Sequence, residues 1–258
     1  VSRGPVIDEA ALFDALAALR VRLPKSLRLA ISGAAPLSPR TQKRYRERFG
    51  HPIVQCYGLT ESVCFATASG LETVPGSVGK PAGVEVRILR PDLQPLPPGV
   101  RGEIALRGPS VVTRGYFRRP RELDECFQDD GWLLTGDMGH LDEHGRLFIT
   151  GRRKNILIRG GEKLYLEDLD LCLEEHPSVK EACGVRMPGR FGFERAVAFL
   201  VGEGPRPDDV ALRTHVRLRL GDLGVPDQIV WTDRIPRGAT GKPLRRVLQA
   251  RHERQGGS

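Results

Sequence analysis

The stretch Gly151-Arg-Arg-Lys-Asn-Ile-Leu-Ile-Arg-Gly-Gly-Glu-Lys163 stands between two parts of the chain that differ in their sequence patterns. Basic residues follow its first glycine, a short run that favours a β-strand comes next, and a pair of glycines lies near its end. This composition predicts a tight turn, a strand and a second turn. Such a segment is either a surface hairpin with a solvated basic edge or a site whose cations hold ribose, phosphate or carboxylate groups. We take it as the boundary between two domains.

The composition of the chain is that of an ordinary soluble protein that is large enough for two folding units. Its 258 residues are 40% hydrophobic and 28% charged. No apolar run approaches the ~20 residues that span a bilayer, and the N-terminal residues lack the order of a secretory signal. The five cysteines include no Cys-x-x-Cys pair, which predicts a reduced, cytoplasmic setting without a disulfide framework. The six histidines are dispersed, so no zinc site is expected.

The net charge of +8 raises the question of nucleic-acid binding. Arginines are scattered, aromatic residues make up only 6% of the chain, and basic and aromatic residues do not alternate as they do on base-stacking surfaces. Basic side chains serve anionic small substrates equally well. We therefore expect no nucleic-acid partner.

The first part of the chain, about residues 1–75, has the pattern of an α/β layer. Residues 8–20 predict a helix, and residues 27–31 predict a buried strand that runs into a loop of small residues. A second helix is expected to begin at Ser38-Pro39, where a cap precedes a proline, and residues 53–57 predict the next strand. Strand, helix and strand in this order indicate an α/β sheet.

A hydroxyl and a carboxylate follow the second strand in the sequence Tyr57-Gly58-Leu59-Thr60-Glu61-Ser62. Open α/β sheets usually bind ligands at this end of a strand, and oxygen ligands suit Mg²⁺. Thr60 and Glu61 could therefore contact a phosphate and its Mg²⁺. Alternatively, Thr60 caps a helix and Glu61 lies in its first turn.

Residues 76–152 predict a small, mostly antiparallel β subdomain, because short β-rich segments alternate with proline and glycine turns. Thr135-Gly136-Asp137 is expected at a turn after a short apolar segment. Asp137 could accept hydrogen bonds from a ribose diol, as carboxylates do in other nucleotide sites. The alternative is an Asx-turn carboxylate.

Beyond the boundary, two amphipathic helices and a few strands predict a compact α+β unit at residues 153–258. The helices are expected at residues 166–176 and 208–220, and the strands at residues 182–186, 196–201 and 229–231. The later segment Gly238-Ala-Thr-Gly-Lys242 predicts a loop that does not hold its own shape. Its lysine is either solvated or delivered to an anion formed elsewhere. The P-loop pattern is absent, because proline follows Lys242.

Seven short motifs occur along the chain: Gly33-Ala-Ala-Pro36, Gln55-Cys-Tyr-Gly-Leu-Thr-Glu61, Gly102-Glu103, Arg114-Gly-Tyr116, Thr135-Gly-Asp137, Gly151-Arg152 and Thr240-Gly-Lys242. In their order and approximate spacing they resemble the AMP-forming adenylate superfamily of acyl-CoA synthetases, peptide-synthetase adenylation domains and firefly luciferase. The resemblance covers nearly the whole chain. It implies the C-terminal part of a large AMP-binding domain at residues 1–152, followed by a small mobile α+β domain at residues 153–258.

The resemblance also implies roles for individual residues of the first domain. The nucleotide would contact Gly33, Ala34, Ala35, Pro36, Gln55, Cys56, Tyr57, Gly58, Asp137 and Arg152. Within this set, Asp137 and Arg152 match the residues that hold the ribose. Thr60 matches the threonine that contacts the phosphate, and Glu61 matches the glutamate associated with Mg²⁺.

In the second domain the resemblance implies a hinge and two functional faces. Lys154 falls at the hinge position, and Gly160-Gly161 matches the backbone that borders the pantetheine tunnel of CoA. Lys242 matches the mobile lysine that stabilises charge during adenylation. A glycine pair suits a narrow thiol tunnel because it has no side chains.

These roles imply an ATP-dependent carboxylic acid–CoA ligase that uses Mg²⁺ and CoA, with a small-molecule carboxylic acid as substrate. Gly238, Leu166 and Asp168 depart from the usual family residues. The family's Ser/Thr/Gly-rich loop for the β- and γ-phosphates is absent from this sequence, so we expect a C-terminal portion that is inactive alone. The alternatives are an enzyme that loads the phosphopantetheine of an acyl carrier protein, and a truncated, non-catalytic nucleotide-binding module.

Overall fold

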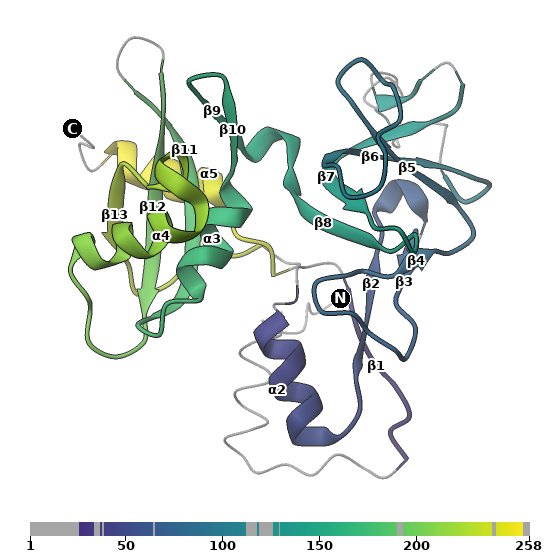
Figure 1. Cartoon of the computed structure of the whole chain (residues 1–258), viewed down its shortest axis with the longest axis horizontal. Helices are drawn as coiled ribbons and strands as arrows, with labels where there is room; N and C mark the ends of the chain where they lie inside the picture. The colour runs from purple at the N-terminus through teal and green to yellow at the C-terminus, as the bar shows by residue number, and fades with distance from the viewer. Residues whose placement is uncertain are drawn as a thin grey trace. The chain divides into compact units, whose positions relative to one another are not determined.

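The computed structural model describes residues 26–33, 37, 39–63, 65–111, 118, 126–128, 130–189, 193–238 and 241–254 of the chain. Contacts between residues divide the chain into two compact units, Val1–Thr150 and Gly151–Ser258, each with its own sheets and core (Figure 1). The second unit begins at Gly151, the first residue of the predicted boundary stretch.

The first sheet contains the strand–helix–strand unit that the sequence predicts, but its first strand is not the buried one expected, because Ile31 is 57% exposed. In spatial order its strands are β1 (Ala30–Ser32), β2 (Ile53–Tyr57), β3 (Thr67–Ala68) and β4 (Lys80–Pro81). β1 and β2 run parallel and are joined by α2 (Pro39–Phe49), whereas β3 and β4 add antiparallel pairs. The helix predicted at residues 8–20 lies outside the described residues.

The second sheet is the β-rich region expected at residues 76–152. Its strands, in spatial order, are β5 (Glu85–Leu89), β6 (Gly102–Arg107), β7 (Leu133–Leu141) and β8 (Leu147–Arg152). β6 is antiparallel to both β5 and β7. Alternate residues of a strand point to one face, and here they fill a core with side chains at most 3% exposed. These are Ile88, Ile104, Leu106, Leu133 and Leu147.

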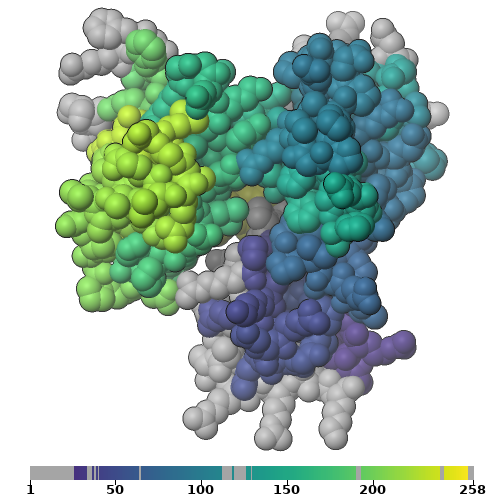
Figure 2. Space-filling model, in the orientation of Figure 1, coloured from purple at the N-terminus to yellow at the C-terminus, as the bar shows by residue number. Residues whose placement is uncertain are grey.

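The second unit is a mixed helix and strand domain, which confirms the predicted fold class. Its central sheet has the order β11 (Val179–Pro188), β12 (Glu194–Gly202), β13 (Gln228–Trp231). A hairpin of β9 (Ile156–Arg159) and β10 (Glu162–Tyr165) precedes it. The helices are α3 (Leu166–Glu174), α4 (Asp209–Gly224) and α5 (Arg245–Arg254). Figure 2 shows this unit, in green to yellow, as a closely packed body.

The two faces of the central sheet bury different side chains. Ala182, Ala198 and Leu200 face a core shared with α3, α4 and the hairpin. Their neighbours on the strands face a second core with α5, through Leu248. Because side chains alternate between the two faces of the sheet, helices pack against both of its faces.

Helix α5 is absent from the sequence-based expectations. It is strongly basic, and only Leu248 and His252, four residues apart, are fully buried on it. Such a short apolar stripe gives a weak helical signal. No helix in the described ranges combines the length and the hydropathy that crossing a bilayer requires.

Candidate functional site

Tyr57 and Asp137, both predicted to contact the nucleotide, meet inside the first unit. The Tyr57 hydroxyl donates a hydrogen bond of 2.8 Å to Oδ2 of Asp137. Tyr57 ends β2, with the half-buried Gly58 after it, and Asp137 lies in β7. Both side chains are buried. A hydrogen bond to a carboxylate is among the stronger ones in proteins, so this contact joins the two sheets at the predicted ribose residue.

A β-bulge, rather than the expected turn after a strand, orients Asp137. The register of β6 and β7 shifts between Glu103 and Ala105, and Gly136 has a φ of 71°. The Asp137 N–H donates to Thr135 Oγ1 at 3.1 Å, and the Gly136 N–H donates to Glu103 Oε1 at 3.1 Å. A bulge re-aims a side chain, and its left-handed position favours glycine. The Thr-Gly-Asp sequence is thus explained by local geometry.

Gly33 directly follows β1, and Gln55 lies in the middle of β2, where it pairs with Ser32. A Cβ added to Gly33 would stand 3.5 Å from the carbonyl oxygen of Cys56, so Gly33 lies beside Cys56, the residue after Gln55. The Gln55 N–H donates to Ser69 Oγ at 2.8 Å, and its Nε2 donates to the Leu37 carbonyl at 3.4 Å. The remaining predicted adenine-side residues lie outside the described residues: Ala34, Ala35 and Pro36.

Thr60 and Glu61 lie in a short 3₁₀ turn directly after β2. Leu59 occupies the N-cap position, and the Ser62 hydroxyl accepts the Leu59 N–H at 3.0 Å. Thr60 is therefore not the cap that the helix-start alternative expected, whereas Glu61 does lie in the first turn, as that alternative predicted. Thr60 is exposed and Glu61 is half-buried at the end of a sheet strand.

The predicted hinge begins with a glycine whose conformation and surroundings both exclude a side chain. Gly151 has a φ of 145°, and an added Cβ would collide with the Glu167 carboxylate. Arg152 follows with extended backbone, and Lys154 is exposed in the 3₁₀ turn η3 (Arg153–Asn155). The Asn155 side chain donates to Glu167 Oε1 at 2.6 Å, which ties this turn to α3.

Gly160 and Gly161 form the two-residue turn between β9 and β10. Their φ values are 57° and 87°, and Arg159 pairs with Glu162 on either side. Positive φ at both central residues is the pattern of a primed hairpin turn, which favours Gly-Gly. A Cβ at either position would meet nothing within 4 Å. The glycines are thus required here by backbone conformation, and they present bare main chain at an exposed tip.

Hydrogen bonds join the two ends of the loop that carries Lys242, whereas its residues 239 and 240 lie outside the described residues. The Gly238 N–H donates to the Lys242 carbonyl at 2.9 Å, and the Gly241 N–H donates to Gly238 at 3.0 Å. The Arg237 guanidinium donates to the Gly241 carbonyl at 2.8 Å and to Glu181 Oε2 at 2.7 Å. The base of the loop is fixed to β11, and Lys242 is half-buried.

Arg245, three residues after Lys242, is the centre of a buried charge cluster. It donates to Asp170 Oδ2 at 2.7 Å, to Glu167 Oε1 at 3.2 Å and to the Gly184 carbonyl. Burial raises the pKa of both carboxyls, and the charge of Arg245 opposes that shift. Burial disfavours the cation, but Asp170 in particular outweighs it and raises the pKa of Arg245. Since Glu167 also abuts Gly151, the cluster connects the Lys242 loop to the hinge turn.

Sequence reasoning missed this cluster. A signal was present, because Glu167, Asp170 and Glu174 recur on one face of the predicted helix at spacings of three and four. Glu174 accepts the Ala182 N–H at 3.1 Å, and its burial raises the pKa of its carboxyl to about 7. The cation that compensates the face lies 75 residues from Asp170, beyond the reach of local patterns.

No group of three or more potential metal ligands occurs in the part of the chain that the structure describes. Mg²⁺ is commonly bound by one or two carboxylates together with phosphates and waters. The single half-buried carboxylate of Glu61, at the end of β2, fits such a site. Thr60, Glu61 and Asp137 belong to the first unit, whereas Lys154, the glycine pair and Lys242 belong to the second.

Family models match both units of the chain. The model described as AMP-binding enzyme matches residues 9–117, and the model described as AMP-binding enzyme C-terminal domain matches residues 169–242.

Curated relatives extend this similarity over most of the chain. The sulfoacetate–CoA ligase of Cupriavidus necator is 37% identical over 87% of this chain and 45% of its own length. The 2-succinylbenzoate–CoA ligase of Geobacillus kaustophilus is 37% identical over 88% of this chain and 47% of its own length. The chain thus spans about half the length of these relatives.

Solved structures show the same fold. ATP-bound MatB from Rhodopseudomonas palustris has a TM-score of 0.83 at 29% identity, over 96% of this chain and 54% of its own. The o-succinylbenzoate CoA synthetase of Bacillus subtilis, in complex with its acyl-adenylate intermediate, has a TM-score of 0.79 at 32% identity, over 92% of this chain and 49% of its own. The chain belongs to the AMP-forming adenylate superfamily.

Proposed function

We propose that the intact protein is an ATP-dependent carboxylic acid–CoA ligase that forms AMP. One observation carries most of this proposal: the buried Tyr57–Asp137 hydrogen bond unites two of the predicted nucleotide residues from different sheets. Membership of the superfamily and similarity to CoA ligases support it. A cytoplasmic setting is part of the proposal and agrees with the free thiols of Cys172 and Cys183.

In the proposed first step, the acid's carboxylate attacks the α-phosphate of ATP, and pyrophosphate leaves. Negative charge builds on the phosphate oxygens, and the Lys242 ammonium stabilises it. Lysine has an unperturbed pKa of ~10.4, so it is charged at neutral pH without any tuning. Thr60 would contact the phosphate, and Asp137 and Arg152 would hold the ribose hydroxyls. Mg²⁺, held by Glu61 and the phosphates, would offset further charge when bound.

In the proposed second step, a thiol attacks the acyl-adenylate carbonyl, a thioester forms and AMP leaves. The bare main chain of Gly160-Gly161 would border the thiol's path, because side chains there would narrow it. The second unit thus offers the Lys242 loop for the first step and the β9–β10 turn for the second. The backbone of the turn that carries Lys154 would rotate as the second unit moves between the two steps.

CoA is the proposed thiol, because the relatives described above are CoA ligases. A carrier-protein phosphopantetheine presents the same thiol chemistry and is the second candidate. Similarity to an amide bond synthetase from Marinactinospora thermotolerans, at 31% identity and a TM-score of 0.81, makes an amine the third acceptor to test. The substrate class is a small carboxylic acid.

The test is an assay of the intact protein with ATP, Mg²⁺ and single acids, using sulfoacetate, oxalate, 2-succinylbenzoate, benzoate and a fatty acid as probes. ATP–pyrophosphate exchange that depends on the acid, followed by acyl-CoA detected by mass, is the expected result. If exchange occurs but a product forms only when a carrier protein or an amine is added, that molecule and not CoA is the acceptor. ATP binding without exchange for any acid would favour the non-catalytic nucleotide-binding module.

A further inference from the structure

The Gly160-Gly161 turn lies at the end of a hairpin whose described strands pair only with each other. A two-stranded hairpin is marginally stable on its own, so it depends on contacts to the rest of the unit. Leu157 and Leu164 are buried and anchor one face of the hairpin in the core shared with α3 and α4. At the tip, Ile158 and both glycines are exposed, so apolar burial does not fix the turn itself.

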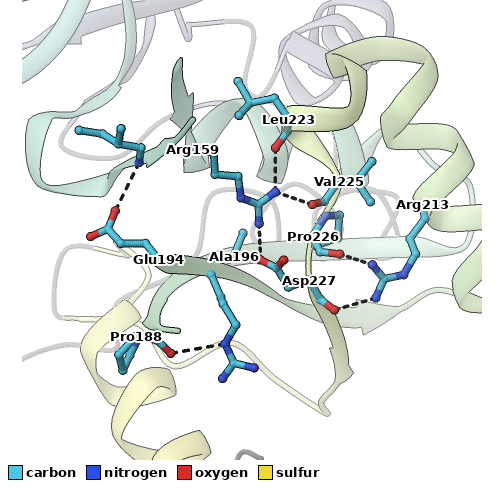
Figure 3. A network of polar contacts seen from close by, with 11 residues as sticks. Arg159, Pro188, Glu194, Ala196, Arg213, Leu223, Val225, Pro226 and Asp227 are labelled. Atoms are coloured by element: carbon cyan, nitrogen blue, oxygen red, sulfur yellow. Dashed lines mark hydrogen bonds and ion pairs between the residues drawn. The ribbon is translucent and has the colours of Figure 1, made fainter. Parts of the chain in front are cut away.

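Arg159, the residue directly before the turn, holds the tip through polar contacts (Figure 3). Its Nη1 donates to the Leu223 carbonyl at 2.9 Å and to the Val225 carbonyl at 2.8 Å, and its Nη2 donates to the Asp227 carboxylate. These acceptors lie at the end of α4 and in the connection to β13. The last carbonyls of a helix lack intrahelical partners and carry partial negative charge, so a guanidinium is well matched to them.

The acceptor side of this contact is itself fixed to the central sheet. The Asp227 carboxylate accepts the Ala196 N–H at 2.7 Å, and the Asp227 N–H donates to the Ala196 carbonyl at 2.8 Å. Arg213 donates to the carbonyls of Pro226 and of Asp227, the latter at 3.0 Å. Asp227 is thus bound to β12 and α4 at once, and Arg159 connects it to the hairpin across 68 residues of sequence.

A second tether acts on the same strand. The Ile158 N–H donates to Glu194 Oε2 at 3.3 Å, and Glu194 also pairs with Arg186 on β11 at 3.2 Å. The Ile158–Glu194 hydrogen bond is exposed and is longer than the hydrogen bonds of Arg159 to the two carbonyls. We therefore expect it to hold the hairpin less firmly than the Arg159 contacts do.

We propose that Arg159 is a positioning residue for thioester formation, which acts by fixing the Gly160-Gly161 turn to the Asp227 segment. This inference rests on the proposed function. No residue separates Arg159 from Gly160, so the position of the turn follows the guanidinium contacts directly. The Lys242 loop has separate anchors in Arg237 and Glu181. Loss of the Arg159 contacts therefore impairs the second step and leaves the first step intact.

The test compares Arg159→Gln and Arg159→Lys with Arg217→Gln in the intact protein. Arg217 is the matched control, because it pairs with Asp222 near the same end of α4, at 2.6 Å, but does not contact the hairpin. The first step is measured as ATP–pyrophosphate exchange, and the second as CoA thioester formation from supplied acyl-adenylate. For Arg159→Gln we expect kcat/KM for CoA to fall about 10- to 100-fold, the scale of a reacting group misplaced by about 1 Å, with exchange within about threefold of the wild type. Arg159→Lys keeps one charge without the planar fork and is expected to lie in between.

Hydrogen exchange of the same proteins tests the positioning itself without any acid or thiol. In Arg159→Gln the amides of residues 156–165 should exchange about tenfold faster, while α3 and the Arg217→Gln protein keep wild-type rates. Unchanged exchange in the hairpin, or an equal loss of both half-reactions, would overturn the inference. If the wild type performs neither half-reaction, the proposed function fails, and the hairpin exchange still decides whether Arg159 fixes the turn.

Discussion

Replacement of Arg245 by methionine tests the buried charge cluster that underlies the Lys242 loop. The guanidinium contacts the carboxylates of Asp170 and Glu167, and its side chain is only 16% exposed. Methionine fills a similar volume but removes the cation. Asp170 and Glu167 would then remain buried without the cation that pairs with both of them, and only the charge of Arg237 would still act on Asp170.

The expected cost follows from that burial. Breaking a buried ion pair by removing one partner costs about 3–5 kcal/mol, because the other charge is left uncompensated. In a unit of this size, about 1 kcal/mol lowers the unfolding midpoint by roughly 4 °C, so a decrease on the order of 12–20 °C is expected. The difference in unfolding midpoint between Arg245→Met and the wild type should become smaller toward pH 5. Burial already raises the pKa of both carboxyls, and without Arg245 to oppose it they protonate more readily and the uncompensated charge disappears.

Differential scanning calorimetry of the intact protein at pH 5 and pH 7.5 measures this effect. Arg251→Met is the matched control, because Arg251 is an exposed arginine on the same helix. Its substitution should change the free energy of unfolding by no more than about 0.5 kcal/mol. Arg245→Lys should lose less stability than Arg245→Met, since lysine keeps the positive charge. If Arg245→Met unfolds at the temperature of Arg251→Met, the cluster does not hold this unit together.

Two further predictions concern single side chains. Tyr57→Phe leaves the Asp137 carboxylate without its 2.8 Å donor, so urea unfolding should show a loss of about 1–3 kcal/mol together with a higher KM for ATP; an unchanged midpoint and KM would refute the role of this contact. Burial raises the pKa of Glu174 from 4.5 to about 7, so the wild type should lose stability as the pH rises from about 4.5 to about 7, and Glu174→Gln should remove the loss. At pH 8 the variant should be more stable by on the order of 2–3 kcal/mol, with little difference near pH 4; parallel stability curves for the two proteins would contradict this.

Much of the fold could be predicted because its elements bury one face. The β-rich region, α3 and α4 show regular apolar spacing, and the start of α2 is marked by Ser38-Pro39. Helix α5 was not predicted, and strand β10 was implied only by the alternative of a surface hairpin. β10 returns from a two-residue turn with one fully buried side chain, Leu164, and α5 is dominated by charge. In both elements tertiary contacts, rather than local pattern, decide the structure.

The candidate site could be anticipated only residue by residue. Tyr57 and Asp137 were each assigned to the nucleotide, yet their contact spans 80 residues and depends on the pairing of two sheets. The bulge that orients Asp137 arises from a register shift with β6, which no local sequence pattern specifies. The partners of Arg245 and Arg159 are likewise distant in the sequence, so their networks became visible only in the folded chain.

Lys242→Ala in the intact protein tests the central claim most directly, because the proposed function assigns one half-reaction to this side chain. ATP–pyrophosphate exchange should fall by about 100- to 1,000-fold, the usual effect of losing a group that stabilises transition-state charge. Thioester formation from supplied acyl-adenylate should remain within about threefold of the wild type, since the Gly160-Gly161 turn is untouched. An equal loss of both half-reactions would contradict the assignment of two steps to two separate loops of the second unit.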